Sequence, residues 1–122
     1  MIRRLSTIRA LACASAVASA LAQAPLAHAE DLVGQPIVVD GDTIHLMQHG
    51  RLRIRLFGID APEGDQWCWR QDRQPYPCGR FAAAFLEQLV AGKHLSCHVE
   101  DTDRYGRAVA TCTIIETKQD VN

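Results

Sequence analysis

The chain has 122 residues, with 14 acidic and 13 basic side chains and a formal net charge of −1. This length allows one small domain with a modest core. Because the charge is close to neutral, the composition excludes a protein that coats nucleic acid through bulk positive charge.

Residues 1–29 are typical of a cleavable secretory signal. Three arginines precede an apolar run over 10–22, and the segment closes on the small-x-small sequence AHA. The apolar run is shorter than the roughly 20 residues of a membrane span. We therefore expect cleavage between Ala29 and Glu30, a secreted or periplasmic protein, and no membrane association after cleavage. An uncleaved anchor is the alternative.

Removal of the leader would leave one domain, residues 30–122, with ten basic side chains against 14 acidic ones and a net charge of −4. An excess of negative charge suits a hydrolase that releases its product better than a protein that grips nucleic acid. Any positive field must then be local, from a bound cation and neighbouring arginines.

Segment 38–63 surrounds a basic strand with three carboxylates: the residues of interest are Asp42, Arg55, Asp60 and Glu63. Carboxylate oxygens suit Ca²⁺ or Mg²⁺, and a guanidinium offers a planar fork to two phosphate oxygens. Phosphodiester hydrolysis needs such a cation and such donors, with a group that orients water. The pattern indicates Asp42 and Asp60 as metal ligands. Arg55 would then bind phosphate, and Glu63 would orient or deprotonate the attacking water.

In residues 51–56, RLRIRL, charge and apolarity alternate strictly, which is the period of a half-buried strand. Leu52, Ile54 and Leu56 would face the core, and the arginines the opposite side. Taken alone, such an arginine face is more typical of a solvated edge strand. The sequence Asp-Gly-Asp at 40–42 is, by itself, more typical of a turn. Their combination favours a site.

Three blocks, VVDGDTIHL, RIRLFGIDAPE and DRYGRAVA, closely resemble the signatures of the thermonuclease (staphylococcal nuclease-like) family, over about residues 37–122. The resemblance implies an OB-fold, a mainly β, five-stranded antiparallel barrel with one helix after the third strand. It implies a Ca²⁺-dependent nuclease that cleaves DNA and RNA with little sequence preference and leaves 3′-phosphorylated products. We expect single-stranded or locally open substrates and no stable protein partner.

By this resemblance Asp42 and Asp60 match the metal carboxylates of the family. The backbone carbonyl of Ala61 matches a further metal ligand, at a position where many relatives carry Thr. Glu63 matches the acid that handles the attacking water. Asp40 is assigned a supporting place behind the metal ligands.

Arg55 and Arg107 match the two phosphate-binding arginines of the family, and Arg104 and Tyr105 lie where relatives contact a substrate phosphate. A second arginine suits the charge that grows on the phosphoryl oxygens during the reaction. Without the resemblance, Arg107 would be interpreted as a solvated turn charge.

The family continues with a further helix after a segment like 118–122, whereas this sequence ends at Asn122. The resemblance therefore implies a C-terminally incomplete domain in which all five catalytic positions are present. Two alternatives to a nuclease follow, a catalytically inactive fragment or an OB-fold module that binds oligonucleotides without cutting them.

Four cysteines follow the leader: Cys68, Cys78, Cys97 and Cys112. An even number in an exported small domain indicates disulfides, with three connectivities open. We favour Cys68–Cys78, which would staple an irregular loop. The second bridge would be Cys97–Cys112, linking two strands that flank a turn. A zinc site with Cys97 and His98 is the rival, but neighbours on a strand point to opposite faces.

The loop at 64–78 mixes aromatic and basic residues: Trp67, Trp69, Arg70, Arg73 and Tyr76. This composition suits the stacking of single-stranded bases. It suits aromatic rings that cover one end of the barrel equally well, and both interpretations stay open.

Residues 79–91 predict a helix that stops at Gly92. Apolar residues recur there at spacings of three and four: Phe81, Ala82, Phe85, Leu86 and Leu89. We expect this stripe to face the core. Residues 95–99 and 108–115 predict two further strands.

Overall fold

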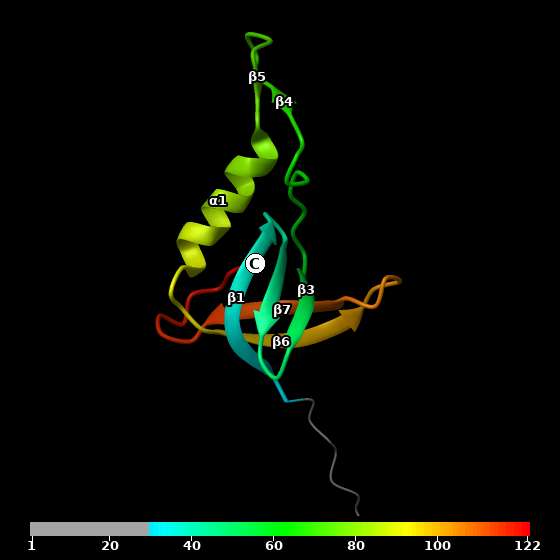
Figure 1. Cartoon of the computed structure of the whole chain (residues 1–122), viewed down its shortest axis with the longest axis vertical. Helices are drawn as coiled ribbons and strands as arrows, with labels where there is room; N and C mark the ends of the chain where they lie inside the picture. Colours follow the sequence, from blue (N-terminus) through cyan, green and yellow to red (C-terminus); the bar gives the residue numbers. More distant parts are fainter. Residues whose placement is uncertain (1–29) are drawn as a thin grey trace, which may run out of the picture.

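The structure is a computed structural model that describes residues 30–122; the predicted leader, residues 1–29, with its cleavage after Ala29, lies outside the described residues. Five strands close into a barrel and one helix lies beside it (Figure 1). The elements are β1 (Leu32–Asp40), β2 (Thr43–Met47), β3 (Arg51–Leu56), β4 (Cys68–Trp69), β5 (Pro75–Tyr76), α1 (Cys78–Val90), β6 (Leu95–Thr102) and β7 (Ala108–Ile114).

The predicted five-stranded barrel with one helix after the third strand is confirmed, but the barrel is mixed and not wholly antiparallel. Its strand order is β1-β2-β3-β7-β6. The closing pair, β3 and β7, is parallel, with Ile54 opposite Ala108 and Leu56 opposite Ala110. Because residues 57–107 connect these two strands, the chain has room to return in the same direction.

The barrel core is apolar, and it includes Ile44, Leu46, Ile54, Leu56, Leu95, Cys97, Ala110, Cys112 and Ile114. Ile54 and Leu56 face inward as predicted, but Leu52 is 39% exposed, so its expected place in the core is wrong. Arg51, Leu52 and Arg53 are all exposed, next to the exposed 48–50 turn. The alternation of burial therefore starts only at Ile54, where the barrel covers one face of β3.

Helix α1 packs on the barrel through part of the predicted stripe, since Leu86 is buried in the core and Leu89 packs against it, but not through its two aromatic residues. Its buried residues are Cys78, Gly79, Leu86 and Val90. Phe81 and Phe85 are 56% and 72% exposed, so their predicted place in the core is wrong. The helix comes so close to the barrel that a Cβ on Gly41 would lie 2.7 Å from the Ala82 Cβ. A small side chain is therefore needed at Ala82, and the rings of Phe81 and Phe85 turn outward.

Both predicted disulfides are present. Cys97 and Cys112 lie directly opposite each other on β6 and β7 and are fully buried. His98, next to Cys97, is exposed, as the argument against a zinc site required. Cys68–Cys78 joins β4 to the first residue of α1, with the two Cα atoms 5.6 Å apart.

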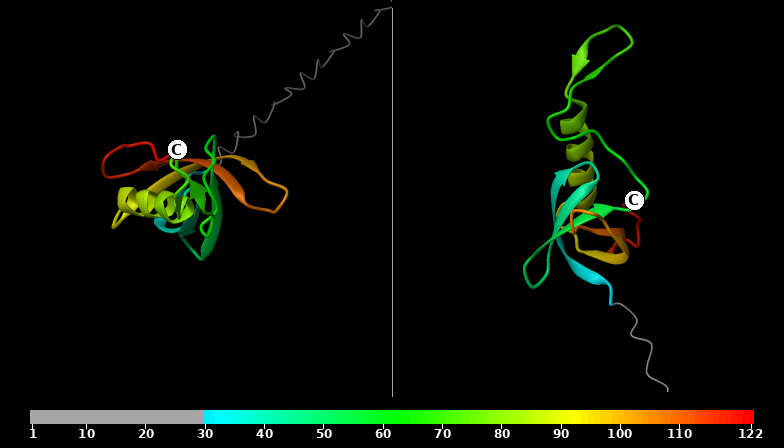
Figure 2. Two further views of the ribbon diagram at one scale, coloured as in Figure 1. Left: turned by 90° about the horizontal axis from the view of Figure 1, so that it is seen from above. Right: turned by 90° about the vertical axis from the view of Figure 1, so that its right-hand side faces the viewer.

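Strands β4 and β5 form a small hairpin, separate from the barrel, beyond the amino end of α1 (Figures 1 and 2). The helix and this hairpin together extend well past the barrel. No helix within residues 30–122 has the length and apolarity needed to cross a membrane.

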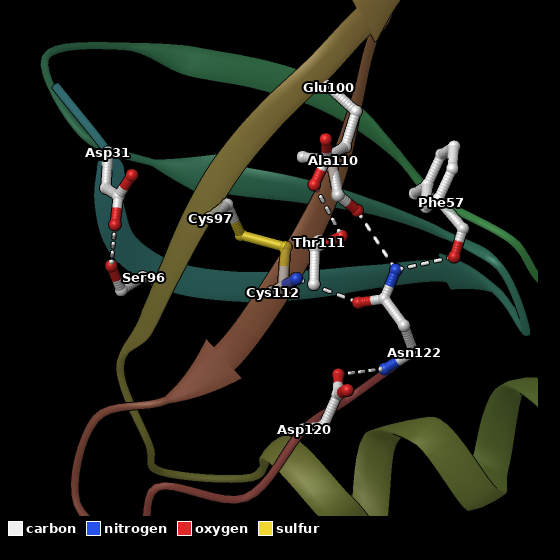
Figure 3. Close-up of a disulfide and its surroundings, with 10 residues drawn as sticks. All are labelled: Asp31, Phe57, Ser96, Cys97, Glu100, Ala110, Thr111, Cys112, Asp120 and Asn122. Atoms are coloured by element: carbon white, nitrogen blue, oxygen red, sulfur yellow. Dashed lines mark hydrogen bonds between the residues drawn. A yellow bond between two sulfur atoms is a disulfide. The ribbon is translucent and has the colours of Figure 1, made fainter. Parts of the chain in front are cut away.

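The last residue, Asn122, ties the end of the chain to the barrel (Figure 3). Its Oδ1 accepts the Cys112 N–H at 2.8 Å. Its Nδ2 donates to the carbonyl oxygens of Phe57, at 2.7 Å, and Ala110, at 3.1 Å. These bonds join β7 to the segment that follows β3.

Candidate active site

Asp42 lies in the turn between β1 and β2 and is only 4% exposed. Its Oδ1 accepts the Thr43 hydroxyl at 2.9 Å, and its Oδ2 accepts the Ala61 N–H at 3.0 Å. The Asp42 N–H faces Oδ1 of Asp40 at 3.4 Å. Since the turn packs closely, with Gly41 against Ala61, the chain holds this carboxylate in one place.

The Arg55 guanidinium bridges the two predicted metal carboxylates. Nη1 donates to Oδ2 of Asp42 and Nη2 to Oδ1 of Asp60, both at 3.0 Å. Nη2 also reaches the Ile59 carbonyl at 3.4 Å. Three of the five N–H donors of a guanidinium are thus engaged within the described residues, which leaves two for another acceptor. The Asp60 side chain is 90% exposed, so it offers its oxygens to solvent.

The surroundings shift the pKa values of Asp40 and Asp42 in opposite directions. Burial acts to raise the pKa of the Asp42 carboxyl. Hydrogen bonds from its neighbours and the charge of Arg55 outweigh burial, so the pKa of Asp42 lies below its usual value. Burial and a hydrogen bond with Asp42 raise the pKa of Asp40. Asp42 therefore stays ionised beside Arg55, and Asp40 is the more readily protonated partner behind it.

Arg107 is fixed by the turn that precedes β7. Its Nε donates to Oδ2 of Asp103 at 2.7 Å, and Oδ1 of Asp103 accepts the Arg107 N–H at 2.9 Å. Burial acts to raise the pKa of Asp103, but these bonds hold it below its usual value. The guanidinium carbons of Arg104 and Arg107 lie 4.9 and 5.6 Å from the centre of the Tyr105 ring. Because the side-chain bond uses Nε, both Nη nitrogens of Arg107 can serve an anion.

An open pocket of about 470 Å³ adjoins this turn, lined by Arg53, Glu63, Tyr105, Gly106 and Arg107. Glu63 brings an exposed carboxylate to it, and the two arginines bring positive charge. Arg53 and Arg107 precede the paired residues Ile54 and Ala108, so parallel strands deliver both arginines to the same end of the barrel. A pocket lined by one acidic and two arginine residues can hold an anion near a base.

The structure thus gathers the predicted residues into two groups. Asp42, Asp60, Ala61 and Arg55 form the first through the bonds above. Glu63, Tyr105 and Arg107 share the pocket, whereas Arg104 is not among its lining residues. The segment 60–63 joins the two groups. The roles assigned to these residues stay predictions, because their positions alone do not test them.

Sequence reasoning missed two residues here. Arg53 lines the pocket, and its place on the arginine face with Arg55 was the available signal. Asp103 holds Arg107, and their spacing of four residues was a weaker signal, since the turn geometry decides whether they meet.

The aromatic loop does not cover the end of the barrel. Trp67 and Trp69 are 59% and 71% exposed, so the packing interpretation is wrong for both tryptophans. Tyr76 is half-buried, stacks on Phe81 with ring centres 6.1 Å apart, and lies 5.4 Å from the Arg70 guanidinium carbon. The hairpin therefore presents two free indole rings beside an arginine.

A five-stranded OB-type barrel that carries acidic and arginine residues in these two groups defines the class of this domain. The chain belongs to the staphylococcal nuclease homologue family, whose model matches residues 53–122.

Several curated proteins share this region. Succinoglycan biosynthesis protein ExoI of Rhizobium meliloti is 40% identical over 95 residues, 77% of this chain and 48% of that protein. An uncharacterized endonuclease of Escherichia coli O157:H7 is 40% identical over 79 residues, 63% and 45% of the two chains. The probable staphylococcal-like nuclease CAN1 of Oryza sativa subsp. japonica is 44% identical over 59 residues, 48% and 15%. The chain spans about half the length of the first two relatives.

Proposed function

We propose that this chain is a secreted nuclease that uses Ca²⁺ to hydrolyse phosphodiester bonds of DNA and RNA with little sequence preference. One observation carries the proposal: a single guanidinium, that of Arg55, bridges Asp42 and Asp60 at 3.0 Å each. Family membership and relatives named as nucleases support it.

The donor set fits a hard cation in an open site. Asp42 is ionised and held in place, Asp60 is exposed, and the Ala61 carbonyl is the third predicted oxygen ligand. Within residues 30–122 no group of three or more acidic, His or Cys side chains converges to hold a metal ion, so the proposed site relies on two carboxylates and a backbone carbonyl. Because Ca²⁺ takes six to eight oxygens, water and substrate phosphate would complete the shell. When bound, the ion would neutralise charge on the phosphoryl oxygens.

The chain's own side chains would perform the remaining steps. Glu63 orients a water molecule and takes its proton as the water oxygen bonds to phosphorus. The bond from phosphorus to the 5′ oxygen breaks, and that oxygen leaves as a hydroxyl group after gaining a proton from solvent, so that the phosphate stays on the 3′ oxygen. Arg55 offers phosphate the two N–H groups that Asp42, Asp60 and the Ile59 carbonyl leave free. Arg107 offers its Nη nitrogens to the oxygens on which charge grows, while Asp103 keeps its side chain in position.

Single-stranded or locally open substrate suits the exposed rings of the hairpin. Trp67 and Trp69 can stack on unpaired bases, and every base has a face to stack, which would keep sequence preference low. A net charge of −4 for residues 30–122 favours release of the cleaved product.

Export is the second part of the proposal. Two disulfides in a domain of this size suit an oxidising compartment. The charged start, apolar run and AHA sequence of residues 1–29 are typical of a leader. Intact-mass measurement of the exported protein should give a chain that begins at Glu30; a chain that retains residues 1–29 would contradict this.

The activity is tested with a fluorogenic single-stranded DNA or RNA oligonucleotide and the purified, disulfide-bonded protein. Cleavage with Ca²⁺, its loss on adding a chelator and its return with excess Ca²⁺ are expected. Cleavage that the chelator leaves unchanged would contradict the role of the metal.

A module that binds oligonucleotides without cutting them is the second candidate. The exposed Trp67 and Trp69 favour it, because stacking on unpaired bases needs no catalytic group. Saturable binding of the same oligonucleotide, with no cleavage in Ca²⁺, would decide for this candidate.

A further inference from the structure

The backbone of Glu63 is held by the base of the β4–β5 hairpin. The Gln66 N–H donates to the Glu63 carbonyl at 2.9 Å, and the Glu63 N–H donates to Oε1 of Gln66 at 3.2 Å. A side chain on Gly79 would overlap the Glu63 carbonyl oxygen. The first turn of α1 and the Glu63 segment therefore touch through bare backbone, which only glycine permits.

The disulfide reinforces this contact. The Gly79 N–H donates to the Gln66 carbonyl at 3.2 Å. Cys78, the neighbour of Gly79, is bonded to Cys68, two residues beyond Gln66. The turn that carries Glu63 is thereby tied to α1 by a hydrogen bond and by a covalent bond, and α1 is anchored in the barrel core by Leu86 and Val90.

The stability of the barrel does not account for this arrangement. The hairpin leaves Trp67 and Trp69 exposed, and it pairs with no barrel strand. The barrel has a disulfide of its own, the buried Cys97–Cys112. What the base of the hairpin does contact is the main chain of Glu63, a residue that lines the same pocket as Arg107.

We propose that Gly79 and the Cys68–Cys78 disulfide are positioning elements for Glu63: together they fix its backbone so that its carboxylate meets the attacking water. This inference rests on the proposed nuclease function. Glu63 lies in an exposed loop, and exposed loops move more than the elements they connect. A displacement of about 1 Å at a reacting group can lower a rate by about 100-fold.

The first test is Gly79→Ala, with Gly64→Ala as its matched control. Both substitutions add one methyl group near Glu63, but the control has room, since its nearest neighbour is the Val39 carbonyl oxygen at 3.8 Å. In single-stranded DNA cleavage with Ca²⁺, Gly79→Ala should lower kcat by about 100-fold and leave KM within about twofold. Gly64→Ala should retain both parameters within about twofold.

The second test separates positioning from general damage. In the Glu63→Gln background the acid is already lost, so Gly79→Ala should change the residual rate by less than about twofold. The double variant Cys68→Ser, Cys78→Ser should also lower kcat, but by less than Gly79→Ala does, because the hydrogen bonds to Gln66 remain. This loss of kcat should likewise be absent in the Glu63→Gln background. Circular dichroism and the retained Cys97–Cys112 bridge report folding. If Gly79→Ala does not fold, the double serine variant is used in its place, with its kcat compared with that of the wild type and its effect compared in the Glu63→Gln background.

Three outcomes are informative. A large loss of kcat that disappears in the Glu63→Gln background supports the inference. A folded variant that cleaves like the wild type, or that loses as much in the Glu63→Gln background, overturns the inference and leaves the nuclease function standing. A folded wild-type protein that does not cleave overturns the proposed function and this inference with it.

Discussion

The guanidinium of Arg55 reaches 13 residues back along the chain to the buried Asp42 carboxylate, at 3.0 Å from Nη1 to Oδ2. It meets the exposed Asp60 at the same distance with its other terminal nitrogen. One planar group thus sets the spacing of two carboxylates. This arrangement links the stability of the β1–β2 turn to the proposed chemistry.

Replacement of Arg55 by lysine should lower both the stability of the protein and its cleavage activity, because an ammonium group cannot present two parallel donors to two carboxylates. The loss of one charged hydrogen bond predicts a free energy of unfolding lower by about 1.5–3 kcal/mol. Cleavage should fall by about 10-fold or more on the same scale. Urea denaturation and the oligonucleotide assay measure the two effects. Arg51→Lys, at the exposed start of β3, is the control, and an equal effect there would contradict the assignment.

Asp60→Asn should separate activity from folding. The Asp60 side chain is 90% exposed, so the free energy of unfolding should change by no more than about 0.5 kcal/mol. Removing one charge from the proposed metal ligands should raise the Ca²⁺ concentration for half-maximal cleavage by about tenfold or more. A Ca²⁺ titration of cleavage measures this. The control Asp72→Asn, in the exposed hairpin, should need the same Ca²⁺ concentration for half-maximal cleavage as the wild type. If Asp60→Asn also needs that same concentration, Asp60 is not a metal ligand.

Asn122→Ala should destabilise the barrel without touching either group of site residues. The substitution removes one acceptor and two donor bonds that join β7 to Phe57. The Cys112 N–H and the Phe57 carbonyl lose their partner, whereas the Ala110 carbonyl still accepts the Phe57 N–H at 2.9 Å; the unpaired groups predict a loss of about 1–3 kcal/mol in urea denaturation. Asn122→Asp retains the acceptor for the Cys112 N–H but places a carboxylate oxygen against the carbonyl oxygens of Phe57 and Ala110, so it should lose at least as much stability. If both variants unfold at the wild-type urea concentration, the hydrogen bonds of Asn122 are not stabilising.

The pair formed by His98 and Asp31 should make stability depend on pH. The hydrogen bond with Asp31 raises the pKa of His98 above its ordinary 6.5, and the same bond lowers the pKa of Asp31 below its ordinary 3.8. The His98 contribution is therefore complete below pH 6.5 and is lost as pH rises through the raised pKa. The Asp31 contribution is present above pH 3.8 and is lost as pH falls through the lowered pKa.

His98→Asn should thus lower the melting temperature more at about pH 5.5 than at about pH 8.5. Thermal denaturation at the two pH values measures the difference. His49→Asn, on the exposed 48–50 turn, should show the same small effect at both. An effect of His98→Asn that does not depend on pH would contradict an ionised pair.

Local pattern predicted much of this molecule, because local spacing decides much of it. The strict alternation around Ile54 and Leu56 marked β3, and the cysteines that face each other across β6 and β7 were predicted as a pair. The closing β3–β7 pair is parallel for a non-local reason, the route of residues 57–107. No window of the sequence contains that information.

The helix shows how a correct period can still place two residues on the wrong face. Phe81 and Phe85 precede Ala82 and Leu86 by one residue, and one residue turns a helix by about 100°. Hydrophobicity favours the rings for the core, whereas the close approach of Gly41 to Ala82 requires small side chains there. The same limit applies to the site: the Asp103 clamp on Arg107 depends on the shape of a turn, which residue types alone do not fix.

The most direct measurement of the central claim is the cleavage rate of Glu63→Gln in Ca²⁺, compared with the wild type and with Glu87→Gln on the exposed side of α1. Loss of general-base catalysis should lower the rate by about 100-fold or more, with the fold intact and with Glu87→Gln at the wild-type rate. Cleavage by Glu63→Gln at the wild-type rate would contradict the claim that this carboxylate serves the attacking water.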